Sequence, residues 1–264
     1  MIGRVLIIAG SDSGAGAGIQ ADLKTVMALG GYATTAITAI TAQNTLGVFG
    51  VHPIPADMVL AQGRAVLTDI GADAVKTGML ASVEVIEAAA SLIDQAGAPA
   101  VIDPVMIATS GARLVGPDAV AALKSLLIGR AALLTPNAPE AAALTGLAVE
   151  TTDDLRRAGE ALLGLGAKAV LMKGGHIPGE TLTDVLMTSA GEATFSGPRI
   201  DTRNTHGTGC SLASACATGL AQGLPLDAAV ARAWAYVAEA IRHAPGLGAG
   251  AGPLDHGWNS TAAT

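Results

Sequence analysis

The sequence predicts an α/β fold with a mostly parallel β-sheet that is covered by helices on both faces. Short apolar runs of strand type alternate along the chain with longer runs of helical periodicity, a pattern typical of such sheets. Aromatic residues make up 2% of the 264 residues while 34 are glycine, so small aliphatic side chains must form the core. No linker, repeat or charge run divides the chain. We therefore expect one domain over residues 1–264, with a frayed tail from about residue 257.

In the first half of the chain, four apolar or β-branched runs predict strands. They are Arg4–Ala9, Thr34–Thr41, Ala74–Thr77 and Ala100–Asp103. Helical periodicity between them predicts helices at Ile19–Leu29, Pro55–Thr68 and Ser82–Gln95. Pro55 suits the start of a helix, and Ser82 is a typical side-chain cap. A loop rich in glycine and serine, Gly10–Gly18, joins the first strand to the first helix.

The second half continues the same alternation. Two more strands are expected, followed by a hairpin around Ala190-Gly191; these four segments are Ala131–Thr135, Ala169–Lys173, Thr183–Thr188 and Glu192–Ser196. Helices are expected at Pro117–Leu127, Pro139–Leu144, Thr151–Leu163, Ser211–Leu220 and Leu226–His243. Strands that alternate with helices in this way form a parallel sheet, because each helix carries the chain back across one of its faces.

Charge and cysteine usage limit the partners of the protein. The net charge is −7 without a basic cluster, which disfavours nucleic acid and an anionic membrane surface as partners. The chain begins with a short apolar strand and no signal-peptide pattern, and no apolar run is long enough to span a bilayer. Cys210 and Cys216 would point to different sides of one helix, so a disulfide is not expected. We expect a cytoplasmic protein.

The segment Gly207-Thr208-Gly209 has the composition of an anion site. Glycines let successive backbone N–H groups converge, and the helix that follows adds unpaired donors and partial positive charge. This combination suits phosphate. Glycines in an ordinary helix-capping turn are the alternative explanation.

Unusual residues follow several of the predicted strands. Because ligands bind beyond the carboxyl ends of strands in such sheets, these residues indicate one shared cleft. They are Gly10–Gly18, Gln43, Asn44, Lys76–Met79, Asp103, Asn137, Glu140 and Lys173–His176. A dinucleotide site is a rival, since Gly16-x-Gly18-x-x-Ala21 fits the relaxed fingerprint. That fold expects an acidic residue for the ribose after the second strand, and none lies between Asp22 and Asp57.

Six motifs, in order, resemble those of the hydroxymethylpyrimidine/phosphomethylpyrimidine kinases of thiamine biosynthesis. They are Ala9-Gly10-Ser11-Asp12 with Gly16–Lys24, Thr41–Thr45, Lys76–Met79, Thr135–Glu140, Lys173–His176 and Asn204–Cys210. The resemblance runs from about Val5 to about His256. It implies a ribokinase-like, three-layer α/β/α fold, frequent homodimers, and phosphoryl transfer from ATP with Mg²⁺.

The resemblance also implies roles at the phosphate end of the cleft. Gly207, Thr208 and Gly209 would supply the anion hole, and Lys173 would neutralise phosphate charge, unless it is a solvated loop lysine. Further residues would bind nucleotide phosphate (Asn137, Asp103) or control Mg²⁺, chiefly through water (Glu140, Asp103). A helix capping box is the alternative for Asn137 and Glu140, and a strand-end turn for Asp103.

At the substrate end, Gln43 is the best candidate. Its side-chain amide offers one donor and one acceptor, which match the ring nitrogen and exocyclic amine of an aminopyrimidine. By resemblance, Asp22 and Gly10 face the pyrimidine, and Met79 forms an apolar wall. Cys210 lies where related sugar kinases carry an aspartate base. A helix N-terminus lowers a thiol pKa, so the pKa of Cys210 is expected to be low and the thiolate could act as the base. A small buried residue without a catalytic role is the alternative.

These observations predict an enzyme that phosphorylates 4-amino-5-hydroxymethyl-2-methylpyrimidine and then its monophosphate. Its partner would be this small-molecule pyrimidine, and the protein would form a homodimer. A pyridoxal or related vitamin kinase of the same superfamily is the first alternative. A non-catalytic pyrimidine-binding protein is a second, which the joint presence of Asn137, Glu140, Lys173 and the Gly-Thr-Gly segment disfavours.

Overall fold

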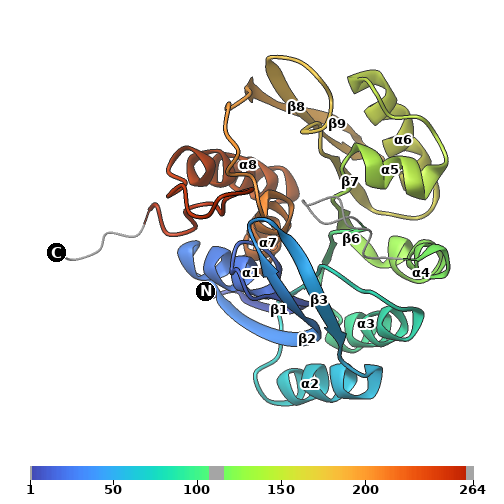
Figure 1. The fold of residues 1–264 in the computed structure, drawn as a ribbon. Helices are drawn as coiled ribbons and strands as arrows, with labels where there is room; N and C mark the ends of the chain where they lie inside the picture. The colour runs from blue at the N-terminus through green and yellow to red at the C-terminus, as the bar shows by residue number, and fades with distance from the viewer. Residues whose placement is uncertain (1, 107–115, 260–264) are drawn as a thin grey trace.

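A computed structural model describes residues 2–106 and 116–259 of the chain (Figure 1). Its strands form one continuous sheet in the order β3-β2-β1-β4-β5-β6-β7-β8-β9. Pairing is parallel from β2 through β1 and β4 to β7, whereas β3, β8 and β9 add antiparallel neighbours at the two ends. The strands are β1 (Arg4–Asp12), β2 (Tyr32–Asn44), β3 (Gly47–Pro53), β4 (Ala74–Thr77), β5 (Ala100–Ile102), β6 (Ala131–Leu134), β7 (Ala169–Met172), β8 (Thr181–Thr188) and β9 (Gly191–Pro198).

Helices cover both faces of this sheet, which confirms the predicted three-layer arrangement (Figure 1). One layer contains α1 (Gly18–Ala28), α7 (Thr208–Ala221) and α8 (Leu226–Arg242). The opposite layer contains α2 (Ala56–Asp69), α3 (Val83–Ala96), α4 (Pro117–Ala122), α5 (Ala138–Thr145) and α6 (Thr152–Gly164). No helix among the described residues combines the length and the apolar character that crossing a membrane requires.

The alternation of β1 explains how one sheet supports two cores. Val5 and Ile7 belong to the cluster under α1, α7 and α8, and Leu6 and Ile8 belong to the cluster on the other face. All four side chains are fully buried. Successive side chains of a strand point to opposite faces, so a continuous apolar run is what a strand buried on both faces requires.

Three local features differ from the sequence prediction. Strand β3, Gly47–Pro53, was not predicted, because it is glycine-rich and exposed and lacks an apolar face. The helix expected at Pro117–Leu127 ends as an α-helix at Ala122 and continues as a wider π-helical turn. Fraying does not begin at residue 257, since Trp258 stacks on His243 with ring centroids 5.7 Å apart; residues 260–264 lie outside the described part.

The topology places the carboxyl ends of the central strands at one edge. The chain leaves β1 towards β2 on one side, and later strands, starting with β4, are added on the other side. In open α/β sheets this reversal creates a crevice beyond the strand ends, where ligands bind. Helix α7 packs against β1, β4 and β5, so its N-terminus lies near this crevice.

Candidate active site

A cleft of about 610 Å³ lies at this edge of the sheet. It collects most of the residues that the sequence singled out, from seven different segments of the chain. Those lining it are Gly10, Gln43, Met79, Asp103, Asn137, Glu140, Lys173, Gly207, Thr208, Gly209 and Cys210. One predicted residue, Asp22, is not among the lining residues. The shared cleft predicted from the strand ends is therefore present.

The start of α7 forms the anion cradle. Gly207 caps the helix with φ +87°, a conformation that favours glycine, and a Cβ there would collide with the carbonyl oxygen of Gly16. No side chain caps the helix. The Thr208 N–H donates to the Thr205 carbonyl oxygen at 3.3 Å, so the donors for a ligand are expected from the N–H groups that follow it in the first turn. A Cβ on Gly209 would lie 3.2 Å from Lys173 Nζ and 3.7 Å from Asp103 Oδ2. The glycine thus keeps open the space between the helix start and these charges.

Lys173 supplies the positive charge opposite the helix start. Its Nζ lies 2.9 Å from Asp103 Oδ1 and 3.9 Å from Glu140 Oε2. Burial lowers the pKa of Lys173, but the two carboxylates outweigh it and hold the pKa above its ordinary value. Lys173 is therefore a permanently charged, mostly buried side chain at the cradle and not a solvated loop lysine.

Asn137 and Glu140 form a capping box on α5. The Asn137 side chain accepts the Glu140 N–H at 2.9 Å, and Glu140 Oε2 accepts the Asn137 N–H at 2.8 Å. The capping alternative is therefore correct, and both residues line the cleft as well. Burial raises the pKa of Glu140 to about 7, although Lys173 acts in the opposite direction.

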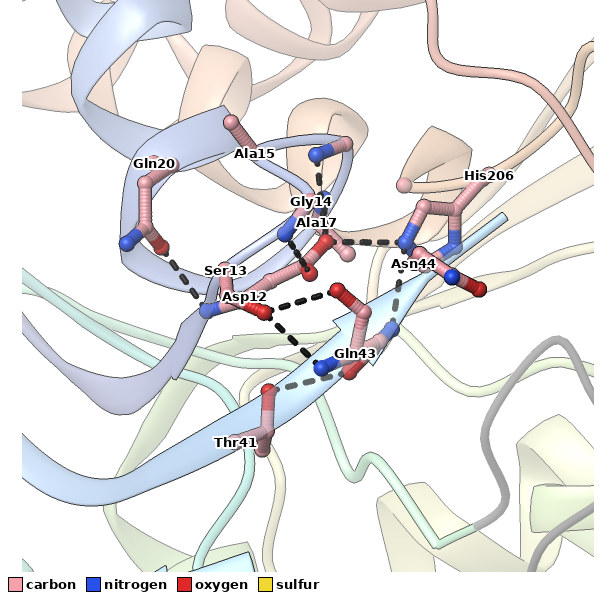
Figure 2. A network of polar contacts seen from close by, with 12 residues as sticks. Asp12, Ser13, Gly14, Ala15, Ala17, Gln20, Thr41, Gln43, Asn44 and His206 are labelled. Atoms are coloured by element: carbon pink, nitrogen blue, oxygen red, sulfur yellow. Dashed lines mark hydrogen bonds and ion pairs between the residues drawn. The ribbon is translucent and has the colours of Figure 1, made fainter. Parts of the chain in front are cut away.

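The substrate end contains a network that sequence reasoning missed as a unit (Figure 2). The Asp12 carboxylate accepts N–H groups of Gly14, Gly16 and Ala17 at 2.8–3.1 Å and so shapes the loop after β1. His206 Nε2 lies 2.9 Å from Asp12 Oδ2 and 3.2 Å from the Gln43 side-chain amide. Asp12 and His206 stood in the quoted motifs, but the pairing of residues 194 positions apart is not visible in a sequence.

Gly10 and Met79 form a close contact beside Gln43. A Cβ on Gly10 would lie 2.6 Å from Met79 Cε, so the methionine could not keep this position against β1 if residue 10 carried a side chain. Both residues line the cleft. The apolar wall expected at Met79 stays a prediction.

The structure corrects the assignment of Asp22. Its carboxylate is fully buried and accepts both 2.8 Å hydrogen bonds of Lys76 Nζ, together with the Ser214 hydroxyl at 2.7 Å. The Asp22 side chain has no solvent-exposed surface, so it cannot contact a pyrimidine directly. Asp22 is a structural anion below the cleft, because an uncompensated Lys76 could not be buried there.

The expected low pKa of Cys210 is also wrong. The half-buried thiol lines the cleft one residue after Gly209. Burial raises its pKa to about 11; Lys76 acts in the opposite direction, and Asp22 and Asp103 add to the increase. Desolvation and two nearby carboxylates raise the thiol pKa by more than the helix N-terminus lowers it. Cys210 and Cys216 are both free thiols, as predicted.

The far end of the cleft is lined by residues that the sequence did not single out. Arg199 donates to the carbonyl oxygens of Gly175, Ile177 and Gly179 at 2.6–2.8 Å and holds the loop after β7. Trp234 and several aliphatic side chains of α8 make this end largely apolar; the lining residues here include Leu182, Val237, Ala238 and Ile241. Apolar loop and helix positions carry no chemical signal in a sequence, so only the fold reveals them.

The glycine-rich stretch before the C-terminus packs against the site. A Cβ on Gly248 or Gly250 would collide with Thr45, and one on Gly252 would collide with Asn204. The Gly252 carbonyl accepts the His206 N–H at 3.1 Å, and His256 lies 2.9 Å from the Ser211 hydroxyl. The stretch therefore supports both His206 and the start of α7.

The start of α7 faces a buried lysine and two carboxylates across this cleft, a set of charges that suits phosphoryl transfer. A sequence profile of the family described as Phosphomethylpyrimidine kinase matches residues 12–255. The hydroxymethylpyrimidine/phosphomethylpyrimidine kinase of Streptomyces coelicolor is 49% identical over 254 residues, which cover 96% of this chain and 94% of the relative. Its namesake from Escherichia coli is 45% identical over 257 residues, 96% and 97% of the two chains. The chain belongs to the phosphomethylpyrimidine kinase family, as the motifs predicted.

Solved structures confirm the fold class. Phosphomethylpyrimidine kinase from Clostridium difficile superposes with a TM-score of 0.81 at 43% identity, over 91% of this chain and 100% of that chain. The pyridoxal kinase of Staphylococcus aureus, in complex with AMP-PCP and pyridoxal, superposes with a TM-score of 0.91 at 34% identity, over 99% and 96%. The fold is therefore shared by kinases of two vitamin precursors.

Proposed function

We propose that the protein transfers the γ-phosphoryl group of ATP to 4-amino-5-hydroxymethyl-2-methylpyrimidine and then phosphorylates the resulting monophosphate. One observation carries the proposal: a single cleft holds an amide, Gln43, at one end and the Gly209–Lys173 anion cradle further along. An amide pairs with an aminopyrimidine edge, and the cradle suits a phosphoryl group in transfer. The curated relatives of matching length carry this activity in their names.

The chain's own residues would act by positioning and by stabilising charge. The hydroxyl oxygen of the pyrimidine attacks the γ-phosphorus of ATP. The bond between the γ-phosphorus and the β–γ bridging oxygen breaks at the same time, and ADP leaves with that oxygen. The N–H groups at the start of α7 and the ammonium of Lys173 would stabilise negative charge on the phosphoryl oxygens. With Cys210 protonated at neutral pH, the hydroxyl proton would pass to a phosphate oxygen or to water.

The carboxylates of the cradle suit Mg²⁺, which they would bind through water molecules. Within the described residues, no three His, Cys, Asp or Glu side chains gather into a ligand set of their own. Mg²⁺ commonly keeps several waters and is held by one or two carboxylates together with substrate phosphates. Asp103 and Glu140 are the side chains that would hold it. When bound, the ion would neutralise charge on the nucleotide phosphates.

The pyridoxal kinase activity of some structural neighbours is a second candidate. The Staphylococcus aureus pyridoxal kinase, whose structure was solved in complex with pyridoxal, shares 34% identity, less than the family members above. We expect phosphorylation of the pyrimidine alcohol with a higher kcat/KM than that of pyridoxal, measured by coupled ADP release. Comparable or higher values for pyridoxal would favour this second function. If ADP is released with neither of the two alcohols as substrate, the remaining explanation is a non-catalytic binding protein.

The Gln43 assignment is tested by Gln43→Ala. A lost pair of hydrogen bonds should weaken pyrimidine binding by about 1–3 kcal/mol per bond and leave ATP binding nearly unchanged, as measured by calorimetry. Gln95→Ala, at an exposed glutamine on α3, is the matched control. Unchanged pyrimidine affinity in a folded Gln43 variant would remove Gln43 from the site.

We also propose a single kinase domain, a homodimer and a cytoplasmic location, where ATP is abundant. The continuous sheet supports one domain. Exposed apolar side chains on β2, β3 and the turn between them support a dimer through this edge; they are Ile40, Leu46, Phe49 and Val51. Sedimentation of the wild type and of Phe49→Ser tests the dimer, and a wild-type monomer at micromolar concentration would contradict it.

A further inference from the structure

The orientation of the Gln43 amide decides which hydrogen-bond pattern the cleft can accept. Oxygen and nitrogen of a side-chain amide exchange places by a 180° rotation, so protons on the neighbouring groups determine which atom faces which partner. As drawn in Figure 2, Gln43 Nε2 lies 3.2 Å from His206 Nε2 and Gln43 Oε1 lies 3.2 Å from Thr41 Oγ1. The protons on these two neighbours can be assigned.

The proton on the His206 side follows from Asp12. Its carboxylate accepts three backbone N–H groups, so it is held in the ionised, acceptor-only form. The 2.9 Å contact between Asp12 Oδ2 and His206 Nε2 therefore has its hydrogen on the imidazole nitrogen. A ring nitrogen that carries hydrogen cannot accept from an amide NH₂. The Gln43 atom that faces His206 must be the carbonyl oxygen.

The Thr41 side leads to the same orientation. The Thr41 hydroxyl has one hydrogen and two acceptors within reach, the Ser11 carbonyl oxygen at 2.9 Å and Gln43 Oε1 at 3.2 Å. The shorter contact takes the hydrogen, which leaves the hydroxyl lone pairs towards Gln43. The Gln43 atom on this side must then be the amide nitrogen. Two neighbours on opposite sides thus specify one orientation, with Oε1 towards His206 and Nε2 towards Thr41. This is the amide turned by 180° from the assignment drawn in Figure 2.

His206 itself has little freedom to turn. The residue is 7% exposed, and its backbone N–H donates to the Gly252 carbonyl oxygen. Its ring lies so close to Gly16 that a Cβ on this glycine would collide with it. The loop shaped by Asp12 and the C-terminal stretch therefore hold the imidazole from two sides. The orientation of the Gln43 amide depends on both segments.

We propose that Asp12 and His206 are positioning residues that lock the Gln43 amide, with Thr41, in this orientation and so exclude pyrimidines with the reversed pattern. The inference rests on the proposed function, because it concerns the aminopyrimidine edge. An amino ring places a donating amine against Oε1 and an accepting ring nitrogen against Nε2. The 4-oxo analogue reverses both groups and meets two repulsive contacts unless the amide can turn.

The test compares kcat/KM for 4-amino- and 4-oxo-5-hydroxymethyl-2-methylpyrimidine on each enzyme. Since both rates come from one preparation, a general loss of folded protein leaves their ratio unchanged. The wild type should prefer the amino compound by at least about a hundredfold. His206→Leu should reduce this ratio by at least about tenfold, and Thr41→Val should reduce it from the other side. His206→Gln, which keeps an N–H directed at Asp12, should retain it, as should His52→Ala at an exposed histidine of β3.

Each other outcome has a distinct meaning. A wild type that phosphorylates neither pyrimidine contradicts the proposed function. A wild type that uses the amino compound but shows the same ratio in His206→Leu and Thr41→Val overturns the locking of the amide. ¹⁵N NMR of the histidine rings gives a check that needs no substrate: His206 Nε2 should carry hydrogen at neutral pH. An unprotonated Nε2 would overturn the inference even if the enzyme is active.

Discussion

Gly209 is the residue whose lack of a side chain matters most for the proposed transfer. In Gly209→Ala the new Cβ would lie 3.2 Å from Lys173 Nζ, within the cradle. It would press against the ammonium and narrow the space between the start of α7 and Lys173. We expect kcat to fall roughly a hundredfold, with a much smaller rise in the KM for the pyrimidine, because a displaced donor acts mainly in the transition state. Steady-state kinetics provide the measurement.

Gly164→Ala is the matched control for this substitution, since nothing lies within 4 Å of a Cβ at that position on α6. Its kinetics should equal those of the wild type. Turnover of Gly209→Ala at the wild-type rate, in a folded protein, would show that phosphate transfer does not use the start of α7.

Cys210 gives the second prediction at this scale. A thiol with a pKa of about 11 is protonated at neutral pH and cannot accept a proton there. Cys210→Ala should therefore reduce kcat by less than about tenfold, and by similar factors for the alcohol and the monophosphate acceptor. Raising the pH from 7 to 9 should not accelerate the alcohol step tenfold per unit. Cys216→Ala, at the other buried cysteine of α7, is the control.

A large kcat loss confined to the alcohol acceptor would contradict this prediction. General bases contribute roughly 10²–10⁴-fold, whereas a monophosphate, with a second pKa near 6, needs none. Such a loss would mean that bound substrates lower the thiol pKa well below its value in the unliganded protein.

At the scale of elements, a buried ion pair joins three of them. Asp22 lies on α1, Lys76 on β4 and Ser214 on α7, and both charged side chains are fully buried. Asp22→Ala would leave a buried, unpaired ammonium, so the free energy of unfolding should fall by about 3–5 kcal/mol. Urea unfolding measures this loss. The double variant Asp22→Leu/Lys76→Met removes both charges and should recover a large part of it.

Additive losses in the double variant would mean that the pair is not energetically coupled. Because the ion pair lies below Cys210 and the cradle, the same variants show whether it also positions α7. A kcat that recovers together with stability in the double variant would assign the pair a structural role only.

Elements differ in how far the sequence predicts them. The buried parallel strands are short runs of mostly apolar residues, with Lys76 and Thr77 of β4 as exceptions, so β1, β4, β6 and β7 were predicted within a few residues. Strand β3 could not be predicted, since its pairing with β2 depends on a distant partner and not on its own pattern. The Asn137–Glu140 spacing gave a capping box as the alternative to a role at Mg²⁺; the box is present, and only the fold shows that it also lines a cleft.

The site shows the same limit in its contacts. Gly207–Gly209, Lys173 and Gln43 were found because each residue type has a chemical use after a strand or before a helix. The fold brings Asp12 to His206 and Asp22 to Lys76, and no local pattern contains this information. The raised pKa of Cys210 was missed for the same reason, because burial and neighbouring charges are tertiary properties.

At the scale of the whole molecule, stability should depend on pH through Glu140. Burial raises the pKa of this carboxyl to about 7, above its ordinary value, so the folded protein binds a proton that the unfolded chain releases at lower pH. The contribution of Glu140 to the free energy of unfolding should therefore decrease as pH rises from about 4.5 to about 7. The measured quantity is the difference in unfolding free energy between wild type and Glu140→Gln across this range.

As pH rises, the Glu140→Gln variant should become more stable relative to the wild type, because glutamine stays neutral. Glu160→Gln, at an exposed position of α6, provides the comparison and should show no such trend. A difference that stays constant from pH 4.5 to 7.5 would show that Glu140 is ionised throughout, as a carboxylate fully stabilised by Lys173 and the Asn137 N–H would be.

The central claim is that one cleft binds the aminopyrimidine at Gln43 and passes phosphoryl groups to it at the Gly209–Lys173 cradle. A ³¹P NMR time course of the purified protein with Mg-ATP and 4-amino-5-hydroxymethyl-2-methylpyrimidine tests it most directly. We predict a pyrimidine monophosphate signal that rises and is then replaced by a diphosphate, with one ADP formed for each phosphoryl group transferred. ATP that stays intact, or is hydrolysed to inorganic phosphate without any phosphorylated pyrimidine, would contradict the account.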